Sequence, residues 1–115
     1  MEFKNNKPIF QQIAEHICDE ILQGRYPEGD RLPSVREYAA ELEVNVNTVA
    51  RSFEWLQNQN VVATRRGLGN FVSVGARETV QELRKKEFFE EQVPEFLRTM
   101  KALDITLEEI ISYNK

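Results

Sequence analysis

Residues 32–51 read LPSVREYAAELEVNVNTVAR and carry the signals for two short helices joined by a tight turn. Ser34 is followed three residues later by Glu37, which is the spacing of a capping box and predicts a helix N-terminus. Asn45 can cap a second helix, whose first turn contains Asn47. A second helix with polar residues at its exposed N-terminal end is typical of the recognition helix of a helix-turn-helix protein.

Apolar residues recur at helical spacing in both segments, so each predicted helix has one face to bury. They are Val35, Tyr38, Ala39 and Leu42 in the first helix and Val49, Phe53 and Leu56 in the second. Arg51 lies away from the second apolar stripe. We therefore expect its side chain on the face that is left to solvent.

A β-hairpin is predicted soon after the second helix. Two β-prone runs, residues 61–64 and 70–74, flank a loop that holds two glycines. The loop opens with Arg65 and Arg66, so the tip of the hairpin would be basic. Helix, turn, helix and hairpin in this order form the winged helix-turn-helix pattern, with the hairpin as the wing.

Four stretches of the chain resemble the GntR family of bacterial transcriptional regulators, in its small YtrA-like branch. They are PIFQQI at 8–13, GRYPEGDRLPSVRE at 24–37, VNVNTVAR at 44–51 and RRGLGNFV at 65–72. The run from Gly29 to Glu37 is specific to that family. Two positions depart from the family pattern, since Glu43 stands where a turn glycine is usual and Val46 where proline or a polar residue is usual.

The resemblance implies a sequence-specific DNA-binding regulator, a repressor in its expected role, that binds a pseudo-palindromic operator as a homodimer. YtrA-like regulators often sit beside genes for ABC transporters, so it also implies control of a transporter operon. The pattern and the resemblance together predict DNA contact at Ser34, Arg36, Asn45, Asn47, Thr48, Arg51, Arg65, Arg66, Gly67 and Gly69. Helix capping alone would explain Ser34 and Asn45, and an ordinary solvated helix face would explain Asn47, Thr48 and Arg51.

The net charge of −4 and the isoelectric point of about 5.1 argue weakly against DNA binding. The charge is unevenly distributed, however. Residues 45–75 contain three arginines and one glutamate, a local net charge of +2. A protein with this distribution is expected to bind nonspecific DNA poorly and to depend on a correct site.

The tail that follows Gly75 is highly charged and amphipathic. Pro94 lies inside its predicted long helix and should kink or split it near Gln92. Thr106 and Glu109 form a second capping box, which opens a short last helix. The apolar stripe is longer than a small head can cover, so we expect a second copy of the chain to cover it. The expected dimerisation residues are Phe89, Val93, Phe96, Leu97, Met100 and Ile110.

The predicted fold is therefore mostly α with a small β-hairpin wing. It consists of a winged helix-turn-helix DNA-binding domain at residues 1–75 and a short C-terminal helical dimerisation arm at residues 76–115.

Other classes of function find little support in the sequence. One histidine and one cysteine, without a glycine-rich phosphate loop, leave nothing from which to build a catalytic or metal site, so we expect neither an enzyme nor a cofactor. No apolar run reaches the length of a membrane span and no signal peptide is present, which predicts a cytoplasmic protein without a membrane partner. The alternative is a winged-helix module for protein–protein contact without DNA binding. The sequence identifies no small-molecule effector.

Overall fold

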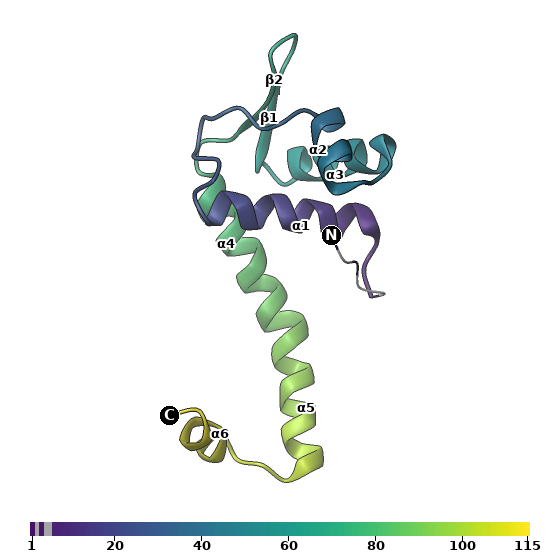
Figure 1. The fold of residues 1–115 in the computed structure, drawn as a ribbon. Coiled ribbons are helices and arrows are strands. Elements are labelled where there is room, and N and C mark those ends of the chain that lie inside the picture. Colours follow the sequence, from purple (N-terminus) through teal and green to yellow (C-terminus); the bar gives the residue numbers. More distant parts are fainter. Residues whose placement is uncertain (2, 4–5) are drawn as a thin grey trace. The chain divides into compact units, whose positions relative to one another are not determined.

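The computed structural model describes Met1, Phe3 and residues 6–115, and it contains two compact units, Met1–Gln81 and Glu82–Lys115. The first unit opens with three helices (Figure 1). These are α1 (Ile9–Leu22), α2 (Val35–Leu42) and α3 (Val46–Asn58). A hairpin of β1 (Val62–Arg65) and β2 (Gly69–Val72) follows, and then α4 (Ala76–Glu87), which begins in the first unit and ends in the second.

The helix starts that capping predicted are confirmed. Ser34 accepts a hydrogen bond from the Glu37 backbone N–H at 3.1 Å, and the Glu37 carboxylate accepts one from the Ser34 N–H at 3.3 Å. At the start of α3, the side-chain oxygen of Asn45 accepts from the Asn47 N–H at 2.8 Å. Each side chain satisfies a backbone donor that the first turn of a helix leaves without a partner.

Glu43 ends α2 in the left-handed conformation, with φ of 56° and ψ of 49°. Its backbone N–H donates to the Ala39 carbonyl, as in a left-handed helix cap. The turn between the two helices therefore has the shape that a glycine would favour, although a residue with a Cβ occupies the position. Such a residue holds this conformation at a cost of roughly 1–2 kcal/mol.

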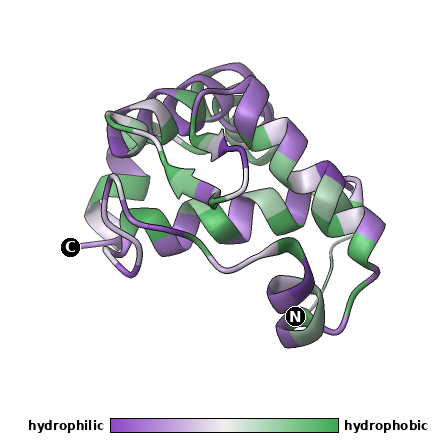
Figure 2. Ribbon diagram, turned by 90° about the horizontal axis from the view of Figure 1, so that it is seen from above, coloured by the Kyte–Doolittle hydropathy of each residue, from purple (hydrophilic) through white to green (hydrophobic). Residues whose placement is uncertain are grey.

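The core of the first unit is built from all of its elements, and hydrophobic and hydrophilic segments alternate along its helices (Figure 2). Its fully buried side chains include Ile13, Ile17, Tyr38, Val49, Phe53, Leu56, Val61, Val72 and Val80. The Ser52 hydroxyl donates to the Phe10 carbonyl at 2.6 Å, which ties α3 to the first turn of α1. Because Ala76 and Val80 are buried in this core, the start of α4 is part of the packed unit.

A buried carboxylate joins α1 to α2. Glu20 is only 4 % exposed and accepts hydrogen bonds from the Tyr38 hydroxyl at 3.0 Å and from Arg25 at 2.8 Å. His16 lies one turn earlier on α1, with its Nε2 3.6 Å from the same carboxylate. Burial raises the pKa of Tyr38 well above its usual range, and the negative charge of Glu20 raises this pKa further.

The hairpin is antiparallel, with Val62 opposite Val72 and Arg65 opposite Gly69. Both strands differ by one or two residues from the predicted runs at 61–64 and 70–74. The reason is a tight turn, in which the Leu68 N–H donates to the Arg65 carbonyl at 2.9 Å. This turn extends the pairing to Arg65 and Gly69, so Arg65 belongs to a strand and not to the loop.

The segment that enters α2 runs beside β2 as a third extended piece. The Leu32 N–H donates to the Asn70 carbonyl and the Val72 N–H donates to the Asp30 carbonyl, each at 2.9 Å. Between these bonds, Arg31 forms an isolated antiparallel bridge with Phe71. The backbone of Arg31 is therefore fixed against the wing.

The second unit contains the end of α4, a π-helical turn at Phe88–Gln92, α5 (Val93–Leu103) and α6 (Leu107–Tyr113). The interruption that Pro94 predicted near Gln92 is thus present as a wider turn, which holds more residues than a turn of an α-helix. Proline has no N–H to donate to the preceding turn, and a π-helical turn is a usual way to accommodate the gap. The Thr106–Glu109 capping box at the start of α6 is confirmed.

The described helices include none that is long and apolar enough to cross a membrane.

Candidate nucleic-acid interface

The first turn of α3 presents a mixed polar and apolar surface. Asn47 is exposed, Thr48 is half-buried, and Val46 is 45 % exposed. Val49 and Phe53 follow Val46 by three and seven residues, so they lie on the same stripe of the helix, and both are buried in the core, whereas Asn47 lies away from this stripe. The packing therefore fixes which face of α3 is available to a partner. Val46 was not among the predicted contact residues. The signal that could have suggested a contact there is an apolar residue in the exposed first turn of a recognition helix.

Arg51 is exposed one turn further along α3, and it does not extend freely into solvent. Its guanidinium carbon lies 4.2 Å from the centre of the Phe10 ring on α1, which is a cation–π contact. A cation–π contact uses the charge of the guanidinium and not its N–H donors, so these donors stay available for hydrogen bonds.

Ser34, Arg36 and Asn45 lie around the N-terminal ends of α2 and α3. The side-chain oxygens of Ser34 and Asn45 are used as helix caps, as described above. Arg36 is exposed in the first turn of α2, and within the described part of the chain no carboxylate lies within 4.0 Å of it. DNA contact at these three residues stays a prediction.

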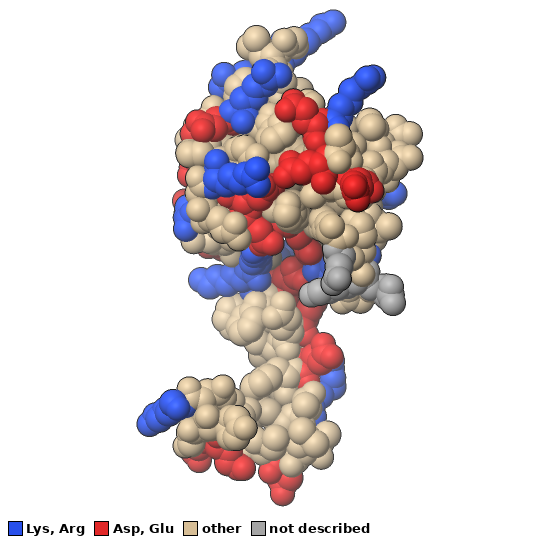
Figure 3. All heavy atoms as spheres, viewed as in Figure 1, with Lys and Arg blue, Asp and Glu red and all other residues tan. Residues whose placement is uncertain are grey.

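The wing carries a basic surface. Lys and Arg side chains project from the end of the first unit that holds the hairpin (Figure 3). The guanidinium carbon of Arg65 lies 4.6 Å from the centre of the Phe71 ring on the neighbouring strand. Arg66 is exposed at the tip. Among residues 1, 3 and 6–115, neither arginine has a carboxylate within 4.0 Å.

The two glycines of the wing differ in their surroundings. Gly67 has φ of 78°, and a Cβ added there would meet nothing within 4 Å. Gly69 has φ of 114°, and a Cβ added there would lie 3.0 Å from Nε of Arg31. Gly67 therefore serves the turn and leaves the tip open, whereas Gly69 makes room for the Arg31 side chain.

A polar network connects the wing to α3, and the sequence did not reveal it. The Gln57 amide near the end of α3 donates to the Thr64 hydroxyl on β1, and it lies 3.5 Å from the Asn70 side-chain oxygen on β2. The Thr64 hydroxyl donates to that same Asn70 oxygen at 2.6 Å. The recognition helix and both strands of the wing are thereby held in one arrangement.

The second unit has no buried side chain between Glu82 and Lys115. Three of the six predicted dimerisation residues are exposed, namely Phe89 at 59 %, Phe96 at 46 % and Leu97 at 55 %. The other three, Val93, Met100 and Ile110, are half-buried. The unit taken by itself thus leaves large apolar side chains in water, as the amphipathic pattern predicted.

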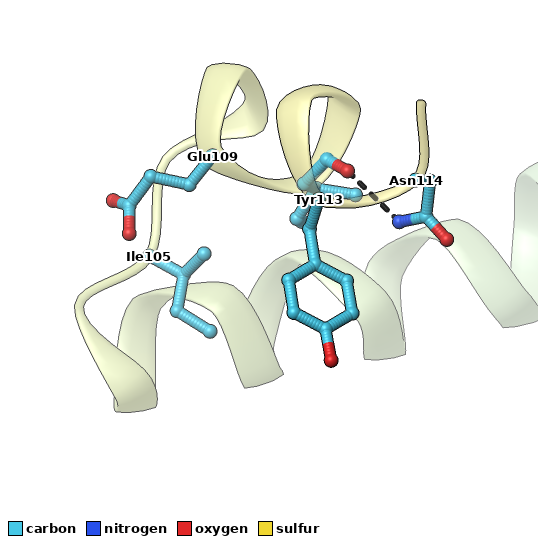
Figure 4. A pocket seen from close by; sticks show the side chains of 5 residues that line it. Ile105, Glu109, Tyr113 and Asn114 are labelled. Atoms are coloured by element: carbon cyan, nitrogen blue, oxygen red, sulfur yellow. Dashed lines mark hydrogen bonds between the residues drawn. The ribbon is translucent and has the colours of Figure 1, made fainter.

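A shallow pocket of about 320 Å³ lies along α6 and the residue that leads into it (Figure 4). Its lining residues are Ile105, Glu109, Ile110, Tyr113 and Asn114. Tyr113 is 90 % exposed, so the pocket is open to solvent and does not enclose a molecule. The Glu109 carboxylate is used in the capping box, and the Asn114 amide donates to the Ile110 carbonyl at 2.8 Å.

No cluster of His, Cys, Asp and Glu in the described residues could hold a metal ion. The first unit instead combines a helix-turn-helix, a polar recognition helix and a basic wing joined to that helix. These features define a winged helix-turn-helix DNA-binding protein.

Comparison with known proteins identifies the family. Residues 9–72 match the model of the gntR family of bacterial regulatory proteins. The chain belongs to the GntR family, and its relatives place it in the YtrA-like branch. GntR-family proteins are DNA-binding transcriptional regulators without enzymatic activity, which confirms the prediction of a regulator and not an enzyme.

Two Bacillus subtilis proteins are similar over nearly the whole chain. YhcF, an uncharacterised helix-turn-helix transcriptional regulator, is 39 % identical over 110 residues, which cover 96 % of this chain and 89 % of YhcF. YtrA, a helix-turn-helix transcriptional repressor, is 30 % identical over 112 residues, which cover 97 % of this chain and 85 % of YtrA. The crystal structure of a protein assigned to the GntR family from Bacteroides thetaiotaomicron is 48 % identical, with a TM-score of 0.79 and 91 % of each chain covered.

Proposed function

We propose that this regulator acts as a homodimer and represses transcription from a pseudo-palindromic operator. The proposal of a homodimer rests on the exposure of apolar side chains in the second unit. This unit has exposed apolar side chains on α5 and no buried residue between Glu82 and Lys115. Burial of apolar surface is the main driving force of protein association, and a second copy offers an identical face.

Each protomer would then place one recognition helix in a major groove. In helix-turn-helix dimers the two half-sites lie a whole number of helical turns apart, which makes the operator mirror the two-fold symmetry of the protein. The proposed contacts are the exposed side chains of α3, with Arg36 and the cap residues at the helix ends. Arg65, Arg66 and the glycines of the wing would approach the neighbouring backbone or minor groove.

Repression is supported by the similarity to YtrA, which is a repressor. Control of a transporter operon is a finer proposal that rests on the resemblance to YtrA-like regulators alone. A protein that acts on bacterial DNA would work in the cytoplasm, and this location is proposed for the same reason.

The test is selection of binding sites from a random-sequence duplex pool by the full chain. The expected product is an inverted repeat that binds two protomers in light scattering of the complex. Recovery of a single half-site bound by one protomer would contradict the homodimer, and failure to enrich any sequence would contradict the specific operator.

A further inference from the structure

Arg31 lies next to the wing, and it was not among the predicted contact residues. It is exposed, and its backbone bridges Phe71. The bonds from Leu32 to Asn70 and from Val72 to Asp30, on either side of the bridge, hold that backbone in register with β2. The backbone that carries the Arg31 side chain is thus fixed beside β2.

The register of the strands places Arg31 on the same face of the wing as Arg65. Residues opposite each other in antiparallel strands point to the same face, so Arg31 shares a face with Phe71, and Arg65 shares a face with Gly69. Gly69 and Phe71 are two residues apart on β2, and alternate residues of a strand also share a face. All four residues therefore belong to one face of the wing.

Both guanidinium groups lie close to this face. Arg65 rests on the Phe71 ring, and Nε of Arg31 lies 3.0 Å from the position of a Cβ at Gly69. In the portion of the chain that is described, neither group has a carboxylate within 4.0 Å, whereas Arg25 is paired with Glu20. Two like charges are held on one surface without an acidic partner, which favours binding of an anion.

We propose that Arg31 is a further DNA-contacting residue, and that it binds a backbone phosphate on the face of the wing that it shares with Arg65. The planar guanidinium suits two-point contact with phosphate oxygens. Gly69 supports this contact because its missing Cβ lets the Arg31 side chain lie flat against the strand. The proposal rests on the proposed mode of DNA binding and adds a residue to it.

The experiment measures binding of the full chain to the selected duplex and to a scrambled duplex over a range of salt concentrations. Arg31→Gln should lower the slope of log K against log salt by about one unit, because one fewer counterion is released. It should weaken binding to the two duplexes by the same factor, since phosphate contacts carry no sequence information. Arg31→Lys keeps the charge and should keep the wild-type slope.

Lys115→Gln is the matched control, because it removes the same charge from an exposed residue two positions after the end of α6. This variant should bind as the wild type does.

An unchanged slope in Arg31→Gln would overturn the proposal. An equal loss of slope in Arg31→Lys would also overturn it, because that result would assign Arg31 a packing role. A loss of affinity of Arg31→Gln confined to the selected duplex would overturn it as well, because that result would assign a base contact. If the wild-type chain itself shows no salt-dependent DNA binding, the proposed mode of binding fails first, and the two failures are thereby distinguished.

Discussion

The guanidinium carbon of Arg51 on α3 lies 4.2 Å from the centre of the Phe10 ring on α1. An exposed arginine of the recognition helix is thereby held in place by the first helix before DNA arrives. Ordering a long side chain on binding costs roughly 0.5–1.5 kcal/mol, and a side chain that is already ordered avoids part of this cost.

Arg51→Ala should weaken binding to the selected operator by about 1–3 kcal/mol, which is the usual loss for a good base contact. Binding to a scrambled duplex should change much less. The measurement is a titration of both duplexes at one salt concentration. Equal affinity of the variant and the wild type for the selected duplex would exclude Arg51 from base recognition.

The wing should contribute affinity that depends on salt. Replacing both Arg65 and Arg66 by Ala should lower the slope of log K against log salt by about one to two units. The control is Lys101→Ala with Lys115→Ala, which removes two exposed positive charges from the second unit. A wild-type slope in the wing variant would show that the wing does not touch DNA.

The dimerisation arm can be tested with one substitution. Phe96→Glu should convert the dimer to a monomer, because burying an unpaired carboxylate in an apolar interface costs several kcal/mol. Arg98→Glu is the control, since residue 98 points to the opposite side of α5 at helical spacing. Light scattering of the full chain gives the mass. A monomeric wild-type protein, or a dimeric Phe96→Glu variant, would contradict the assignment.

The bond between Tyr38 and Glu20 should stabilise the first unit. Tyr38→Phe removes a hydrogen bond to a buried carboxylate and should lower the free energy of unfolding by about 1.5–3 kcal/mol. Urea unfolding near neutral pH measures the change. A Tyr113→Phe variant, which removes the hydroxyl of a tyrosine that is 90 % exposed, is the comparison and should lose less.

The same tyrosine gives an alkaline pH dependence. In the unfolded chain the phenol of Tyr38 ionises near pH 10 (about its usual pKa), while in the folded protein burial and Glu20 raise this pKa. Stability from Tyr38 is therefore complete below about pH 10 and falls at higher pH, by roughly 1.4 kcal/mol per pH unit. Tyr38→Phe should show a shallower alkaline decline, and an identical decline would contradict the assignment.

Glu43 offers a stabilising change. Glu43→Gly should raise the free energy of unfolding by about 0.5–1 kcal/mol, because glycine adopts a positive φ without the Cβ penalty but loses more entropy on folding. Glu43→Ala keeps a Cβ and should give no gain. Urea unfolding of the wild type and the two variants measures the free energy of unfolding. Equal stability of Glu43→Gly and the wild type would argue against strain at this turn.

Much of the fold follows from local signals in the sequence. The capping boxes at Ser34 and Thr106, the Asn45 cap and the break near Pro94 were predicted from residues within a few positions of one another. The wing was also predicted, although its strand ends were shifted by one or two residues because they depend on pairing across the hairpin. The turn at Glu43 formed despite the missing glycine, since the packing of α2 and α3 outweighs a small local penalty.

The sequence by itself determined the order of the helix-turn-helix and the wing, the starts of three helices and the resemblance to the family, because capping, periodicity and turn chemistry act between near neighbours. Only the tertiary structure decided where the functional side chains rest. Arg51 meets Phe10 and Arg31 meets Gly69 across about 40 residues of chain, and the Gln57 network joins α3 to both strands. These contacts depend on how separate elements pack together, and packing is set by the whole core and not by any local pattern.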